Sequence, residues 1–247
     1  MAGSGGQRPA IVFLHYFGGS RRAWDGVIAQ LGDRYDCFAP DLRGFGDAWN
    51  VGCPFTVDTY ADDVAELIAD CGIERFVLVG HSMGGKIALA LAARRPAGLA
   101  SLVLLAPSPP SPEPMSDDDR EKMLASHGDR NAARATARKI VGRPLAPIRL
   151  EEVVQDMLVT SAAAWRAWYE GGSRETLTAV GHLSLPTLVL SGSDDSVIPR
   201  TVLESDVMPC LSNARLISIA GSGHLLPLEA TDEVAGLIER AALAGDA

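Results

Sequence analysis

Short runs of apolar residues alternate along the chain with segments whose apolar residues recur at helical spacing. The short runs are rich in Val, Leu and Ile, which favours buried parallel strands covered by helices on both faces. We predict strands at Ala10–Leu14, Tyr35–Ala39, Phe76–Val79, Leu102–Leu105, Thr187–Leu190 and Ala214–Ser218. We predict helices near Trp24–Leu31, Val57–Asp70, Gly84–Ala93, Val202–Asp206 and Thr231–Ala244. The fold class that this alternation predicts is α/β, with a mostly parallel, doubly wound sheet.

One region interrupts the alternation. After Leu105 the chain enters the proline-dense stretch Pro107–Pro114, and no convincing strand follows until Thr187. Helical patterns occupy this interval, starting at a capping-box-like sequence at Ser116 and continuing at 151–159 and 162–169. We therefore predict a core made of residues 1–107 and 182–247, with a helical cap insertion at 108–181.

Composition narrows the class of protein and its partners. A chain of 247 residues with 47% hydrophobic residues is long enough for one α/β domain with a sizeable core. The net charge of −9 argues against nucleic acid or an anionic membrane as a partner, but it does not identify a substrate, because acidic soluble enzymes are common. The cysteines are scattered, the N-terminal stretch Met1–Pro9 lacks an apolar segment, and no run could span a bilayer. These features predict a cytoplasmic protein.

The most informative motif is Gly-x-Ser-x-Gly at Gly80–Gly84, which lies between a predicted strand and a predicted helix. So tight a turn gives its central residue a strained backbone, and a Cβ at Gly80 or Gly84 would clash with the neighbouring strand or helix. Ser82 is then the candidate nucleophile. The alternative is a glycine-rich turn with an incidental serine, which the flanking strand and helix disfavour.

A serine hydroxyl is a weak nucleophile near neutral pH, so it needs a base, and the base needs an orienting group. Two later predicted strands end in loops that carry such groups. Asp194 and Asp195 follow the strand at 187–190, and His224 follows the strand at 214–218. Because the carboxyl ends of parallel strands meet at one edge of a sheet, we expect these side chains to lie near Ser82.

Together these motifs resemble those of the α/β-hydrolase fold superfamily, in particular its capped serine esterase and lactonase-like members. The motifs appear in the order expected for that fold, at His15–Ser20, Gly80–Gly84, Gly192–Asp195 and Gly221–His224, with a further similarity at Asp41–Gly46. The resemblance covers nearly the whole chain. It is highly specific for the superfamily and weakly specific for the reaction.

The resemblance implies roles for individual residues. Ser82 corresponds to the nucleophile, and His224 to the general base that later acts as general acid. The family pattern Gly-x-x-Asp implies that Asp195 is the acid of the triad and that Asp194 is a turn residue.

The resemblance also implies an oxyanion hole formed by the backbone N–H groups of Met83 and Phe17. The family usually has His-Gly-x after the first strand, whereas this chain has Tyr16 in the position of the glycine. Either the loop adopts a different backbone or the phenol points into the pocket. Tyr16 is therefore a candidate substrate contact.

Several further residues have two interpretations. Trp165 and Trp168 in the insertion pack a small helical layer, roof a substrate pocket, or do both, and we take them as candidate substrate-binding residues. His15 and His81 are expected to be structural hydrogen bonders, and Lys86 to be solvated. No ligand-spaced cluster or nucleotide-binding motif occurs, so we expect neither a metal nor a cofactor.

The function predicted is a serine hydrolase that cleaves a small to medium, mostly apolar carboxylic ester or lactone through an acyl-enzyme. A C–C bond hydrolase of a dienone acid, a thioesterase and a cofactor-free perhydrolase are alternatives within the same fold. A fourth alternative is a ligand-binding signalling protein that keeps the triad and turns over slowly.

Overall fold

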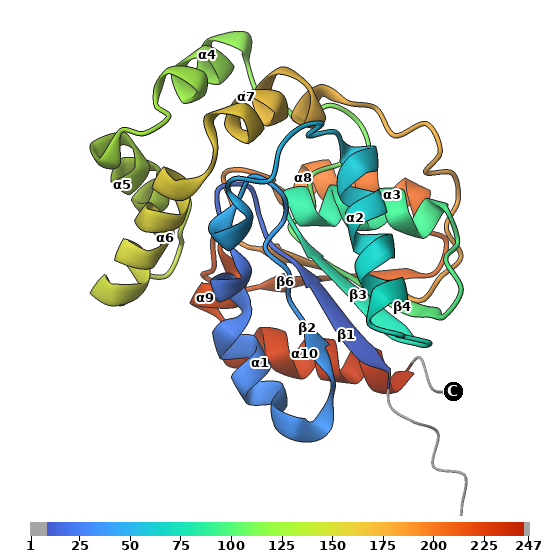
Figure 1. Ribbon diagram of the computed structural model, residues 1–247. Helices are drawn as coiled ribbons and strands as arrows, with labels where there is room; N and C mark the ends of the chain where they lie inside the picture. Colours follow the sequence, from blue (N-terminus) through green and yellow to red (C-terminus); the bar gives the residue numbers. More distant parts are fainter. Residues whose placement is uncertain (1–8, 245–247) are drawn as a thin grey trace, which may run out of the picture.

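A computed structural model describes residues 9–244, so most of the N-terminal stretch considered above, and the last three residues, lie outside the described part. Its centre is a parallel sheet whose strands run in the order β2-β1-β3-β4-β5-β6 (Figure 1). The strands are β1 (Ala10–Leu14), β2 (Cys37–Phe38), β3 (Phe76–His81), β4 (Leu99–Leu105), β5 (Thr187–Gly192) and β6 (Ala214–Ile219). The predicted fold class is therefore confirmed.

Both faces of the sheet are buried, which explains the continuous apolar runs in the sequence. Alternate residues of a strand point to opposite faces. On β3, Phe76 and Leu78 belong to one core cluster, whereas Val77 and Val79 belong to the other. Helices α2 (Val57–Asp70) and α3 (Met83–Ala93) cover the first face, and α1 (Asp25–Leu31) and α10 (Thr231–Ala244) cover the second (Figure 1).

Several predicted boundaries need correction. Strand β4 begins at Leu99, before the predicted 102–105, and α6 begins at Pro147, before the predicted 151–159. Strand β2 is shorter than the predicted 35–39, since it lies at the edge of the sheet and pairs only through Cys37 and Phe38. The helix predicted from Trp24 is preceded by a 3₁₀ turn at Arg21–Trp24, which Ser20 caps. The helix predicted at 202–206 is a short α8 (Arg200–Val202) that continues as a π-helical turn at 203–207. A short helix α9 (Leu226–Glu229) follows β6 and was not predicted.

Four helices occupy the interval between β4 and β5, and Figure 1 shows them gathered at one end of the molecule. They are α4 (Asp117–Ala125), α5 (Arg130–Lys139), α6 (Pro147–Val159) and α7 (Ala162–Glu170). Side-chain caps begin three of them, at Ser116, Asp129 and Ser161. Helix α5 was not predicted, because its buried face consists only of Ala133 and Ala137. The division of the chain into a core and a cap domain stays a prediction.

Between residues 9 and 244, no helix combines the length and the apolar character needed to cross a membrane.

Candidate active site

Ser82 lies in the turn between β3 and α3 with a backbone φ of +53° and ψ of −116°. Such a conformation costs a non-glycine residue about 1–3 kcal/mol and persists only where the surroundings enforce it. The Ser82 N–H donates to the carbonyl of Leu105 at 2.9 Å, and the Ser82 carbonyl accepts from the N–H of Gly85 at 2.8 Å and of Ser108 at 3.0 Å. Strand β4 and the loop after it therefore hold the turn in place.

The glycines of this turn are required by close backbone approach. A Cβ on Gly80 would lie 2.4 Å from the carbonyl oxygen of Gly84, and one on Gly84 would lie 2.4 Å from the carbonyl oxygen of Leu14. Neither contact is possible without moving backbone. The clash predicted from the motif is thus confirmed, and Ser82 lies on a strained turn at a helix N-terminus.

His224 and Asp195 meet across the loops after β6 and β5. The ring Nδ1–H of His224 donates to Asp195 Oδ2 at 2.8 Å, and both side chains are buried. The other carboxylate oxygen, Oδ1, accepts from the N–H groups of Val197 at 2.8 Å and Ile198 at 3.0 Å. Asp194 is exposed and its carboxylate accepts from the hydroxyl of Ser193. The structure therefore brings Asp195, and not Asp194, to His224.

The interaction between His224 and Asp195 shifts the pKa values of both residues. Burial disfavours the charged imidazolium, but the charge of Asp195 and the hydrogen bond to it outweigh burial and raise the pKa of His224. Burial would likewise raise the pKa of Asp195, yet His224 and the two backbone N–H donors hold that pKa below its ordinary value. With Nδ1 engaged by Asp195, Nε2 of His224 is the nitrogen that can accept a proton.

A single carboxylate organises the loop that carries His224. Glu229, at the end of α9, accepts from four backbone N–H groups, which belong to Gly142, Arg143, Gly223 and Leu225 at distances of 2.8, 2.8, 2.8 and 2.9 Å. The N–H of His224 itself donates to the carbonyl of Ile140 at 2.7 Å. The segment between α5 and α6 is thereby joined to both neighbours of His224. The sequence analysis did not identify Glu229.

The two other histidines near the site are structural, as expected. His15 donates from Nδ1 to the carbonyl of Tyr16 at 2.8 Å and accepts at Nε2 from the N–H of Leu42 at 3.1 Å. His81 donates from Nε2 to the carbonyl of His224 at 2.8 Å. Burial and the neighbouring His224 lower the pKa of His81 to about 3, so this ring stays neutral beside the candidate base.

Ser82 and His224 line one cavity of about 370 Å³. Within residues 9–244, no hydrogen bond joins Ser82 Oγ to the His224 ring, although both residues line the cavity. Phe17 lines the same cavity, and its N–H has no hydrogen-bond partner in the described part of the chain. The N–H of Met83 is in the first turn of α3, where an α-helix offers it no internal acceptor.

Aromatic side chains form one wall of the cavity. Phe17 lies against Trp165, Trp168 and Tyr169, with ring centroids 4.9, 5.9 and 5.0 Å apart. All three α7 residues are buried, and each lines the cavity. The Trp165 indole N–H donates to the carbonyl of Met123 at 2.8 Å, which ties α7 to α4. The predicted cluster therefore packs the helical layer and also faces Ser82's cavity.

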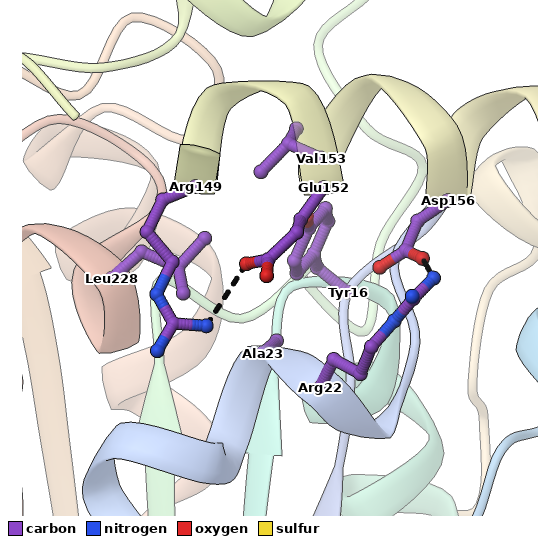
Figure 2. A pocket seen from close by; sticks show the side chains of 8 residues that line it. All are labelled: Tyr16, Arg22, Ala23, Arg149, Glu152, Val153, Asp156 and Leu228. Atoms are coloured by element: carbon purple, nitrogen blue, oxygen red, sulfur yellow. Dashed lines mark hydrogen bonds and ion pairs between the residues drawn. The ribbon is translucent and has the colours of Figure 1, made fainter. Parts of the chain in front are cut away.

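Tyr16 is buried, and its ring packs where a Cβ on Gly19 would lie, at 2.7 Å. The ring borders the main cavity and also a small second cavity between the 3₁₀ turn and α6 (Figure 2). There Asp156 accepts from the Ser20 hydroxyl at 2.7 Å and pairs with Arg22 (Figure 2). The side chain in the position of the family's glycine is thus accommodated under α6, beside the candidate oxyanion loop.

Lys86 is not solvated, contrary to expectation. It is fully buried, and its ammonium donates to the carbonyls of Ser111 at 3.2 Å and Glu175 at 2.5 Å. Burial lowers the pKa of Lys86 to about 8. The prediction was wrong because the acceptors come from segments far along the chain. Within residues 9–244, no group of three or more His, Cys, Asp or Glu side chains is arranged to hold a metal ion.

Comparisons with known proteins agree with this architecture. Residues 11–237 match the model of the alpha/beta hydrolase family. The chain is 28% identical over 237 residues to the bifunctional esterase/perhydrolase of Acinetobacter calcoaceticus, covering 89% of this chain and 86% of that protein. The fold is similar to that of an esterase from Exiguobacterium antarcticum, with a TM-score of 0.86, 19% identity, and coverage of 95% and 92% of the two chains.

A local match extends to longer proteins. Over 105 residues the chain is 37% identical to an uncharacterized protein of Mycobacterium tuberculosis, and this match spans 42% of this chain and 30% of that protein. The matched segment therefore covers less than a third of the length of that relative.

Proposed function

The chain belongs to the alpha/beta hydrolase family, and on that premise we propose that it is a serine hydrolase of small to medium, mostly apolar carboxylic esters or lactones. One observation carries the proposal. Ser82, on a strained strand-to-helix turn, and His224, whose ring is hydrogen-bonded to buried Asp195, line a single cavity with an aromatic wall. This combination supplies a nucleophile, a base and an apolar binding space at one place.

The reaction would proceed in two stages. Ser82 Oγ attacks the acyl carbon while its proton passes to His224 Nε2, and Asp195 stabilises the imidazolium that forms. The C–O bond to the leaving group breaks, and His224 returns the proton to the departing oxygen. Water, deprotonated by His224, then attacks the acyl carbon. The bond from that carbon to Ser82 Oγ breaks, His224 returns the proton to Ser82 Oγ, and the acid is released.

Charge on the tetrahedral intermediate would be stabilised by the N–H groups of Phe17 and Met83. Donors of this type act because they meet a negative charge that is absent from the substrate, and each contributes about 3 kcal/mol. The missing acceptor for the Phe17 N–H in the described chain supports this role. Trp165, Trp168 and Tyr16 would contact the acyl or alcohol part of the substrate.

The test is covalent labelling with a fluorophosphonate, which reacts with activated serines. We expect the wild-type protein to be labelled at Ser82, and Ser82→Ala to lose both the label and ester hydrolysis. Ser196→Ala is a matched control, because Ser196 is an exposed serine that lines the same cavity, and this variant should stay labelled. Labelling at another residue, with hydrolysis retained in Ser82→Ala, would contradict the proposal.

A further inference from the structure

Glu113 brings a carboxyl group to the cavity that holds Ser82 and His224. It lies in the loop between β4 and α4 and lines the cavity. The negative charge of Glu113 contributes to the raised pKa of His224, so the carboxyl is within electrostatic range of the candidate reaction centre. Neither the serine mechanism nor the candidate oxyanion hole uses this group.

The backbone of Glu113 is anchored, whereas its carboxyl is not. The N–H donates to the carbonyl of Ser173 at 2.8 Å, and the carbonyl accepts from Arg120 Nη2 at 3.2 Å. Within residues 9–244 the carboxyl oxygens make no ion pair and no hydrogen bond of normal geometry. The fully buried Ser108 hydroxyl lies beside the carboxyl and attracts it, but the two groups do not meet hydrogen-bond geometry. A fixed loop that directs an unsatisfied polar group to a cavity is arranged for a ligand.

The buried cations nearby are engaged elsewhere. Lys86 donates to the carbonyls of Ser111 and Glu175, and Arg120 donates to the carbonyls of Tyr169 and Glu113 and to the Ser173 hydroxyl. Burial raises the pKa of Glu113, and the attraction of Ser108, Lys86 and Arg120 only partly opposes it. A cationic donor that entered the cavity would therefore stabilise the ionised carboxylate.

The rest of the cavity also favours a cation. Phe17, Trp165, Trp168 and Tyr169 offer aromatic faces, which attract ammonium groups, most strongly when water is excluded. The other charged residues that line the cavity are Asp119, Lys122 and Lys139, and all three are exposed. Solvent and salt screen these exposed charges, whereas Glu113 is partly buried and is screened less.

We propose that Glu113 determines specificity by selecting esters that carry an ammonium group and rejecting esters that carry a carboxylate. The ammonium N–H groups donate to the Glu113 carboxylate, and the aromatic wall packs against the adjoining carbons. The proposal rests on the proposed serine hydrolase function and names the substrate class of that site. It also counts against a dienone acid as substrate, because the carboxylate of such a substrate would meet the negative charge of Glu113.

Boronic acids test this directly, because they form reversible tetrahedral adducts with a nucleophilic serine. Phenylboronic acids that carry an aminomethyl, an ethyl or a carboxyl group, each in the meta and the para position, differ in charge more than in size. Their inhibition constants are measured against hydrolysis of a small neutral ester. In the isomer that discriminates best, we expect the aminomethyl compound to bind about tenfold more tightly than the ethyl compound, and the carboxyl compound to bind weakest.

Glu113→Gln keeps the size of the side chain and removes its charge. We expect the ratio of the inhibition constants of the carboxyl and aminomethyl compounds to fall by about tenfold or more. Glu121→Gln is the matched control, since Glu121 is exposed on α4 and does not line the cavity. It should keep the wild-type ratio. The rate of phosphonate labelling at Ser82 reports whether each variant keeps an intact site.

The outcomes separate this proposal from the one on which it rests. If none of the compounds, including the ethyl ones, inhibits, the serine mechanism fails. If all inhibit alike in the wild-type protein, or if the preference persists in a Glu113→Gln variant that is still labelled at the wild-type rate, the serine mechanism stands and Glu113 does not select charge.

Discussion

Ser82 and His224 are defined by local constraints that single substitutions can probe. Ser82 is held at a positive φ by hydrogen bonds to β4 and to the loop that follows it. Asp195 holds His224 through one ring nitrogen, and the other ring nitrogen is the one that would act as the proposed base. Removing the carboxylate that orients His224 should therefore have a defined effect on activity.

The two neighbouring aspartates should behave differently. Asp195→Asn should lower kcat by orders of magnitude, because His224 loses its orienting charge, and the corresponding change in a serine protease costs about 10⁴-fold. Asp194→Asn is the matched control and should have little effect, since the Asp194 side chain is exposed. Steady-state kinetics on one good ester measure both. A larger loss in Asp194→Asn than in Asp195→Asn would overturn the assignment.

The pH dependence follows from the raised pKa of His224. The base must be neutral to accept the proton of Ser82, so kcat/KM should fall as the pH drops through an apparent pKa above the ordinary 6.5 of histidine. The fall of kcat/KM on the acidic side (the acid limb of the pH–rate profile) is measured from pH 5 to 9, about two units either side of neutrality. An acid limb clearly below 6.5 would mean that Asp195 does not carry a negative charge beside His224.

At the scale of elements, the loop after β6 and the segment between α5 and α6 are joined through Glu229. A Cβ on Gly223 would lie 2.4 Å from the Gly142 nitrogen, so the two backbones are in close contact. The segment between β4 and β5 thus contacts the loop of the candidate base and also contributes residues that line the cavity. On the other side, Asp156 of α6 joins Ser20 and Arg22 next to the candidate oxyanion loop.

Glu229→Gln tests this connection. It leaves one acceptor oxygen for four N–H donors, so the His224 loop should shift, and a displacement of about 1 Å at a catalytic group can lower kcat by about 10²-fold. Removing the negative charge of Glu229 should also lower the pKa of His224 and move the acid limb to lower pH. The control is Glu233→Gln, an exposed carboxylate 3.9 Å from the Arg143 guanidinium. An unchanged kcat and acid limb in Glu229→Gln would assign Glu229 no positioning role.

At the scale of the whole molecule, the insertion provides a wall that the sheet edge alone lacks. Trp168→Ala should change the preferred length of the acyl or alcohol chain, because a buried aromatic contact contributes about 1.5–3 kcal/mol. The measurement is kcat/KM across a series of esters of increasing length. Ile148→Ala, at a position of α6 that is 68% exposed, is the control. If Trp168→Ala keeps the wild-type preference and only loses thermal stability, Trp168 contributes to packing and does not determine specificity.

The sequence by itself determined the strands, most of the helices that cover the sheet, and the chemistry that depends on near neighbours. Apolar runs predicted the strands because both faces of a parallel sheet are buried. The turn around Ser82 was predictable because its glycines are required by contacts within a few residues and with the adjacent strand. That an aspartate of the loop after β5 meets His224 was predictable because both loops follow neighbouring parallel strands, whereas the choice of Asp195 over Asp194 came from the resemblance to the family pattern.

Only the tertiary structure decided the features that join distant segments. Lys86 can be buried because the carbonyls of residues 111 and 175 accept hydrogen bonds from its ammonium group. No local sequence pattern indicates these partners. Helix α5 depends on packing of two small alanines. Glu113 lines the cavity because residues 120 and 173 fix its backbone, and Glu229 binds the loop of residue 142 across the fold. Polar groups in irregular segments carry no periodicity, so their partners are set by packing.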